Sequence, residues 1–119
     1  MDCFSKIEQI REGFVKSRKL LIAIGDETRQ NIITVLMGRC DGMRVGEITQ
    51  RTHLSRPAVS HHMKILLDCG LVNFDKQGTK NYYSLSIGED FNNLFTLVSH
   101  LAEFKKAKES GLLNEVEVK

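Results

Sequence analysis

A short stretch of the chain carries side chains that could bind a polar partner from one surface: Arg56, Ser60, His61 and Lys64. Val59, Met63 and Leu66 recur between them at spacings of four and three residues, which predicts a helix with these apolar residues inward and the polar set outward. A guanidinium group can donate two hydrogen bonds to guanine, hydroxyl and imidazole groups can bind base edges or phosphate, and an ammonium group suits phosphate. The pattern predicts a helix that reads double-stranded DNA.

Local signals define where this helix begins and ends. Ser55 is a suitable N-cap, Pro57 is tolerated in a first turn, and Gly70 is a suitable stop. A shorter helix is predicted over residues 45–51, with a turn at 52–54 between the two. This is a helix–turn–helix, in which Arg56, Pro57 and Ser60 near the start of the second helix would meet the bases. Ser55 is also expected among the DNA contacts.

A β-hairpin is expected after the helix–turn–helix, with strands at 71–75 and 80–87 around the turn KQGT. Lys76, Thr79 and Lys80 would then contact phosphate or the minor groove beside the main site. A charged turn that only keeps the surface hydrated is the alternative, and the residues alone leave it open.

The remaining elements surround this unit. A helix is predicted from Cys3 to Ile24, with Gly13 and the following basic cluster expected to break or bend it. A second helix, capped by Asp26, should run to Gly38 and bury Ile32, Ile33, Leu36 and Met37. Residues 39–43 read as a turn, and a last helix is expected over 89–108. The order is α-α-α-α-β-β-α: a mainly α winged helix–turn–helix with a small β-hairpin.

We expect one domain over residues 1–119, with the helix–turn–helix and wing at 44–87 and dimerisation helices at 1–24 and 88–109. The apolar stripe of the last helix exceeds what a core of this size can cover, and long first and last helices would gain by packing against a partner. The residues expected at a homodimer interface are Phe4, Ile7, Phe91, Leu94, Phe95, Val98 and Leu101.

Charge is distributed unevenly along the chain. The net charge is only +2, but residues 43–86 hold six basic and three acidic residues, and no acidic residue occurs from Ile48 to Leu67. A positive field on the helix–turn–helix suits phosphate. The chain has no apolar run long enough for a membrane span and no secretory signal, so we expect a cytoplasmic protein without a membrane partner.

Catalysis and metal binding have little support in the residues. No nucleophile–base pair or phosphate-binding loop is present, so no catalytic residue is predicted and the chain is not expected to be an enzyme. Adjacent helical residues point about 100° apart, so His61 and His62 cannot easily share a metal. We expect His61 to face DNA and His62 to lie at the edge of the core with a hydrogen bond. The three cysteines do not form a disulfide framework.

The segment LSRPAVSHHMKILLDCGLV, the hairpin KQGTKNYYSL and the earlier GDETRQNIITVLMG resemble the ArsR/SmtB family of winged-helix regulators over residues 20–87. The resemblance implies a homodimer built from the first and last helices that binds inverted-repeat operators in double-stranded DNA. It also implies repression that an effector relieves.

The family's effector motifs are incomplete here. Arg44-Val45-Gly46 stands where arsenic and lead sensors have Cys-Val-Cys, and only His100 and Glu103 reproduce part of the zinc site of the last helix. No metal or other cofactor is therefore expected. Thiol sensors of the family pair cysteines on the second and last helices. The last helix here has none, which leaves Cys40 and Cys69 as the candidate redox thiols.

The sequence therefore predicts a sequence-specific DNA-binding transcriptional regulator, a homodimeric repressor whose effector is undefined. The alternative is a winged-helix module that binds a protein partner without specific DNA binding. The choice between repression and activation does not follow from the residues.

Overall fold

The computed structural model describes residues 3–111, so both ends of the predicted 1–119 domain lie outside the described part. Four helices, a hairpin and a last helix follow in the predicted order: α1 (Cys3–Ile24), α2 (Glu27–Met37), α3 (Val45–Thr52), α4 (Arg56–Asp68), β1 (Val72–Gln77), β2 (Lys80–Leu85) and α5 (Glu89–Glu109). None of the described helices is long and apolar enough to cross a membrane.

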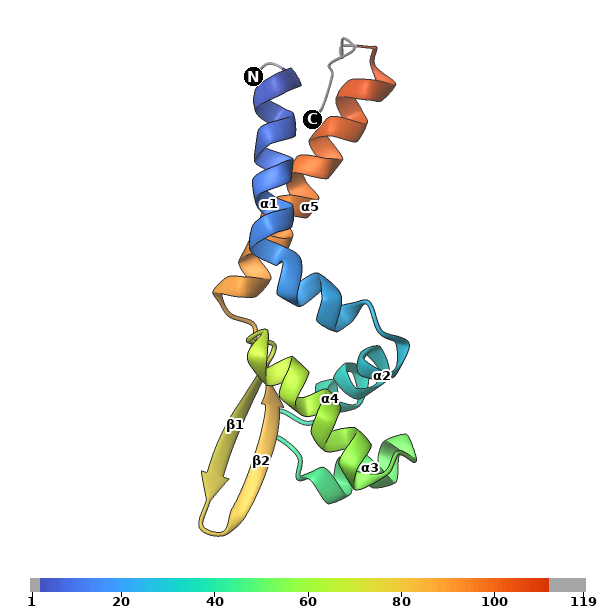
Figure 1. Cartoon of the computed structure of the whole chain (residues 1–119), viewed down its shortest axis with the longest axis vertical. Coiled ribbons are helices and arrows are strands. Elements are labelled where there is room, and N and C mark those ends of the chain that lie inside the picture. Colours follow the sequence, from blue (N-terminus) through green and yellow to red (C-terminus); the bar gives the residue numbers. More distant parts are fainter. Residues whose placement is uncertain (1–2, 112–119) are drawn as a thin grey trace.

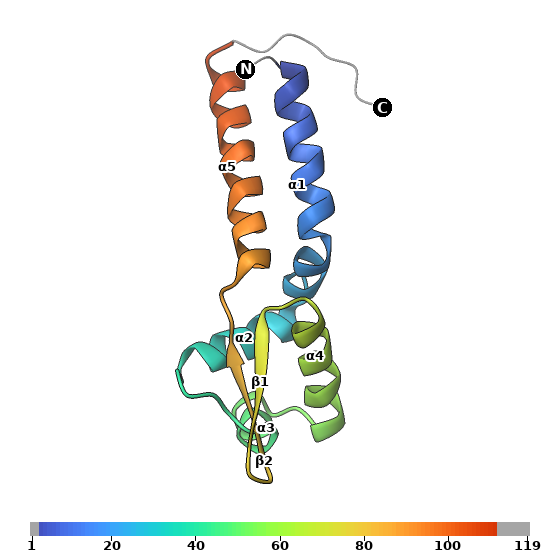
Figure 2. The same ribbon diagram turned by 90° about the vertical axis from the view of Figure 1, so that its left-hand side faces the viewer.

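The molecule has two parts. Helices α1 and α5 stand side by side as an arm, and α2, α3, α4 and the β1–β2 wing form the winged domain beneath it (Figures 1 and 2). The radius of gyration is 18.4 Å and the extents are 58 × 25 × 25 Å. A compact chain of this length would have a radius of about 13–14 Å. The arm therefore projects well beyond the winged domain.

No break occurs at Gly13, and α1 runs through it as one helix. The helix does bend, because its lower half turns away from the upper half (Figure 1). A Cβ atom at Gly13 would lie only 3.0 Å from Leu97 Cδ1 and 3.2 Å from Leu97 Cβ. Leu97 is buried and was not expected in the core. The glycine thus lies at a close approach of α1 to α5, which the residues of α1 alone could not predict.

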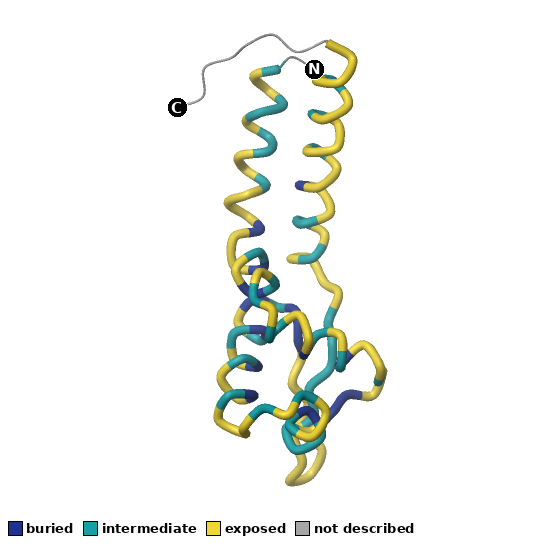
Figure 3. Tube along the Cα trace, turned by 90° about the vertical axis from the view of Figure 1, so that its right-hand side faces the viewer, coloured by how far each residue is buried: buried dark blue, intermediate teal, exposed yellow. Residues whose placement is uncertain are grey.

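The core lies mainly in the winged domain, while most of the arm is exposed or half-buried (Figure 3). Val59, Met63 and Leu66 are fully buried, as their spacing predicted. Full burial of such a side chain contributes about 1.5–3 kcal/mol. Met37 was expected inward but is 66% exposed at the last position of α2, whereas Ile32 and Leu36 of the same helix are buried in the core.

The predicted helix caps are confirmed. Asp26 accepts a hydrogen bond from the Thr28 amide at 3.2 Å, and Ser55 Oγ accepts one from the Ala58 amide at 3.2 Å. His53 ends α3 in the left-handed conformation with φ of 59°, and its amide donates to the Thr49 carbonyl at 2.9 Å. The bonds of His53 and Ser55 define the end of α3 and the start of α4.

The wing is tighter than predicted. Its register pairs Val72 with Leu85 and Gln77 with Lys80, which leaves a two-residue turn with Gly78 at a φ of 64°. Lys76 therefore lies on β1, not in the turn. Met43, expected in a turn, is buried and exchanges two 2.8 Å backbone hydrogen bonds with Tyr83 of β2. This bridge attaches the wing to the start of α3.

Candidate nucleic-acid interface

The outward face of α4 presents the predicted polar set together. Every one of these side chains is exposed, while the opposite stripe of α4 is buried in the core: Arg56, Pro57, Ser60, His61 and Lys64. Ser55 differs from them because its hydroxyl already accepts the capping hydrogen bond of α4. The core thus fixes which side of α4 meets solvent.

The wing adds further polar groups at the same end of the molecule. Lys76, Thr79 and Lys80 are all exposed, and the wing turn lies near α3, at the end opposite the free tip of the arm (Figure 1). Thr79 and Lys80 stand at the turn, where a flanking phosphate could reach them. Lys76 lies one residue pair further along the ladder, opposite Asn81.

A cavity of about 590 Å³ separates the wing from α3. A Cβ atom at Gly46 would lie 3.1 Å from Arg56 Nη2, so the guanidinium group rests against the first turn of α3. The cavity thus connects the leading residue of α4 with the wing turn. Its lining includes Arg44, Gly46, Gln50, Arg56, Thr79 and Asn81.

The sequence prediction did not include Arg44, Gln50 and Asn81 among the candidate DNA contacts. Arg44 is exposed at the N-cap of α3, Gln50 is exposed on α3 itself, and Asn81 is exposed on β2. Asn81 shares one face of β2 with Tyr83 and Leu85, so strand alternation could have predicted that it faces the rest of the winged domain. Only the folded arrangement shows that all three line the same cavity as Arg56.

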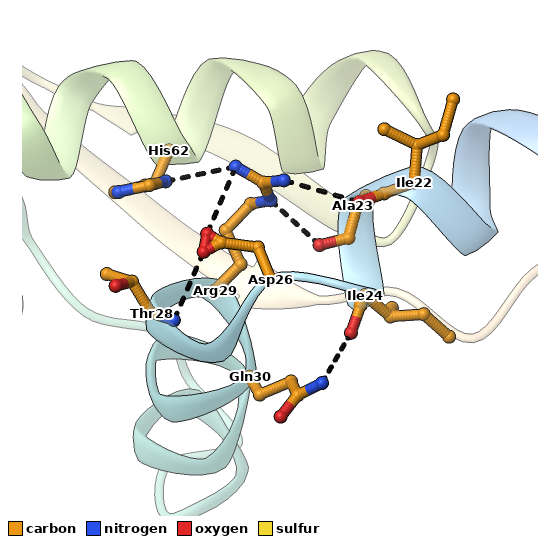
Figure 4. A network of polar contacts seen from close by, with 8 residues as sticks. All are labelled: Ile22, Ala23, Ile24, Asp26, Thr28, Arg29, Gln30 and His62. Carbon is orange, nitrogen blue, oxygen red and sulfur yellow. Dashed lines mark hydrogen bonds and ion pairs between the residues drawn. The ribbon is translucent and has the colours of Figure 1, made fainter.

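A polar network joins the arm to α4 (Figure 4). Arg29 on α2 donates to the carbonyl oxygens of Ala23 at 2.7 Å and Ile22 at 3.3 Å, at the end of α1. Its Nη1 also lies 3.3 Å from His62 Nδ1 and 3.6 Å from Asp26 Oδ2. Since arginine can only donate, Nδ1 is the acceptor in the His62 contact. Arg29 thus contacts α1, α2 and α4 together.

His62 lies at the edge of the core with a hydrogen bond, as predicted. Burial lowers its pKa, and the positive charges of Arg29 and His61 lower it further, against an opposing effect from Asp26. The neutral ring is therefore the form that fits this network. His61, its neighbour, is exposed on the face that also carries Ser60 and Lys64.

His100 and Glu103, the two matches to a zinc motif, both contact a lysine. Lys6 Nζ forms a close ion pair with Glu103 and lies 3.3 Å from His100 Nδ1. The hydrogen bond and charge of Lys6 lower the pKa of the Glu103 carboxyl. No group of three or more metal-ligating side chains occurs within residues 3–111. The Lys6 ammonium group thus contacts both side chains that would have to bind the metal.

The two candidate redox thiols differ in environment. Cys40 is exposed, whereas Cys69 is 5% exposed and its Sγ donates to the Leu66 carbonyl at 3.3 Å. Burial raises the pKa of the Cys69 thiol, so little of the reactive thiolate forms at neutral pH. The structure thus disfavours Cys69 as a sensor.

The fold and the exposed α4 face define a winged helix–turn–helix DNA-binding protein. Residues 26–73 match the model of the bacterial regulatory protein, arsR family. The transcriptional repressor SdpR of Bacillus subtilis is 36% identical over 64 residues, which cover 54% of this chain and 69% of SdpR. The transcriptional activator HlyU of Vibrio cholerae is 32% identical over 83 residues, 70% of this chain and 75% of HlyU.

A solved structure agrees with these sequence matches. An ArsR-like transcriptional regulator from Rhodococcus superposes with a TM-score of 0.68 at 26% identity, over 82% of this chain and 90% of that one. The chain belongs to the ArsR family. It is a DNA-binding transcriptional regulator and not an enzyme.

Proposed function

We propose that this regulator is a homodimeric repressor that binds an inverted-repeat operator. The supporting observation is the combination of one exposed polar face on α4 with a projecting arm that exposes large apolar side chains. The exposed polar set on α4 and the wing would contact the operator, and the arm would join two copies.

The arm carries large apolar side chains that the chain itself does not cover. Phe4, Phe95, Val98 and Leu101 are between 38% and 61% exposed. A second copy would remove these groups from water, and each square ångström buried contributes about 25 cal/mol. We propose these four as the centre of the interface. Ile7, Phe91 and Leu94, also predicted there, are half-buried, and the last two pack against the chain's own core.

A two-fold dimer constrains the operator. Two α4 helices related by a two-fold axis would enter successive major grooves about 34–36 Å apart. The half-sites would then form an inverted repeat. The bound dimer would repress by blocking transcription. Because SdpR is a repressor and HlyU an activator, a reporter assay should measure whether the dimer lowers or raises transcription. Such a regulator would act in the cytoplasm, where it meets its operator.

Selection of bound sequences from random duplexes tests the proposal. The buffer should contain a chelator, because we propose that DNA binding needs no metal cofactor, as the Lys6 contacts to His100 and Glu103 support. We expect an inverted repeat to be enriched at moderate salt. If no sequence is enriched, and a pull-down with this chain selectively retains a protein, the result would favour the protein-interaction module.

A further inference from the structure

A second cavity lies where α2, the base of the wing and the start of α5 meet. Its volume is about 360 Å³, within the range of about 300–1,000 Å³ found for small-molecule sites. None of the predicted DNA contacts lines it. The wall is made chiefly by Ile33, Thr34, Met37, Leu71, Leu85 and Phe91.

The chemistry of the wall limits what could bind. The residues that line this cavity include no charged side chain, so burying an ion there would be costly. Thr34 Oγ1 donates to the Gln30 carbonyl at 2.9 Å, and Gln30 Nε2 donates to the Ile24 carbonyl at 2.8 Å. The side-chain oxygens of Thr34 and Gln30 keep lone pairs. A suitable ligand therefore has an apolar body and at least one hydrogen-bond donor.

Two exposed apolar side chains at the rim of the cavity would be stabilised by contact with such a molecule. Met37 and Ile87 are 66% and 74% exposed, although both are large and apolar. Met37 has a flexible side chain that adapts to irregular shapes. A ligand seated between α2 and α5 would shield both groups from water. We infer that this cavity is a binding site for a small uncharged organic molecule that carries a hydroxyl or N–H donor.

The location would couple the ligand to DNA binding, a part of the inference that rests on the proposed function. Gln30 and Ile24 belong to the same α1–α2 corner at which Arg29 holds the Ala23 carbonyl and contacts His62 of α4 (Figure 4). A ligand that displaces Gln30 would shift this corner. The arm and α4 would then change their relative position.

Titration with 1-naphthol, monitored by NMR of the 13C-labelled methyl groups of Ile, Leu, Met and Thr, tests the site. We expect saturable shifts concentrated at Ile33, Met37 and Leu85. Naphthalene lacks the donor and 1-naphthoate is charged, so each should bind at least fivefold more weakly. Shifts concentrated elsewhere, or equal affinity for naphthalene and 1-naphthol, would overturn the inference.

Two matched variants sharpen the test. Thr34→Val should weaken 1-naphthol binding at least fivefold, because it removes a ligand acceptor from the wall. Thr52→Val removes a comparable hydroxyl, which donates to the Ile48 carbonyl outside the cavity, and should leave the affinity unchanged. Equal effects of both substitutions would count against the site. Intermolecular NOEs to Met37 or Ile87 in a mixed-label sample would show that a second copy fills the cavity, and would also overturn it.

The coupling has a separate readout. Saturating 1-naphthol should change the Kd for a selected duplex at least threefold in the wild type, and this change should be lost in Thr34→Val. Cavity shifts without any change in Kd would overturn the coupling alone. Failure to select any duplex, with the cavity shifts intact, would count against the proposed function and not against the ligand site.

Discussion

At the scale of single residues, spacing predicted burial better than it predicted contacts. The three apolar residues of α4 are buried where the 3.6-residue period placed them, and the hydrogen-bonded position expected for His62 is confirmed. The partner of His62 could not be predicted, because Arg29 lies 33 residues away in sequence. The Lys6 contact with His100, across 94 residues, is hidden for the same reason.

Arg56 is the residue for which we predict the largest effect on sequence preference. Arg56→Lys keeps the charge but loses the two-pronged donor geometry. If the contact is a bidentate hydrogen bond to guanine, the substitution should lower discrimination at one operator position by about 1–3 kcal/mol. Lys64→Ala is the comparison: it should weaken all duplexes alike and reduce the salt slope by about 1. Binding titrations on matched and mismatched duplexes measure both, and unchanged discrimination in Arg56→Lys would contradict the assignment.

His62 should make stability depend on pH. Its folded-state pKa is lowered, so on acidification the unfolded chain takes up the proton first. The free energy of unfolding should therefore fall as the pH drops below about 6.5, the ordinary pKa of histidine, and through the lowered folded-state pKa. Urea unfolding at pH 7.5 and 5.5 should show a smaller decrease for His62→Gln than for the wild type. His61→Gln controls for loss of an imidazole on α4, and equal decreases in the wild type and His62→Gln would refute the prediction.

At the scale of helices and strands, local signals predicted every element and its order. Caps at Asp26 and Ser55, apolar periods and the Gly-containing hairpin turn are all encoded by near neighbours. The errors occur where distant segments decide the outcome. Met43 joins the wing through Tyr83, and Gly13 lies inside α1, where a side chain would press on Leu97 of α5.

The contact between Gly13 and Leu97 makes the arm sensitive to a larger side chain. Gly13→Leu would force the two helices apart, and overpacking of this kind costs about 1–3 kcal/mol. Val15→Leu enlarges an exposed side chain on the same helix and should have little effect. Urea unfolding monitored by circular dichroism measures the difference. A Gly13→Leu protein as stable as the wild type would mean that α1 and α5 do not pack this closely.

At the scale of the whole molecule, the extended shape is the feature that the sequence did not reveal. The stripe on the last helix predicted an apolar excess, but not an arm that raises the radius of gyration to 18.4 Å. The winged domain supplies a core, and the arm supplies exposed apolar surface at a distance from it. The proposed dimer follows from this separation.

The oligomeric state should respond to charge on the arm. Phe95→Glu together with Val98→Glu places two carboxylates among the exposed apolar groups of α5. We expect sedimentation equilibrium to give a dimer for the wild type and a monomer for the double variant. Asn92→Glu adds a charge at an exposed polar position of α5 and should remain dimeric. A double variant that stays dimeric would place the interface elsewhere.

The central claim is that a dimer inserts one α4 helix into each of two successive major grooves. Dimethyl sulfate protection of a selected duplex tests it directly, because the reagent methylates guanine N7 in the major groove. We predict two protected clusters related by a two-fold axis, with centres about 10–10.5 base pairs apart. A single protected cluster, or binding that leaves every guanine N7 reactive, would contradict the account.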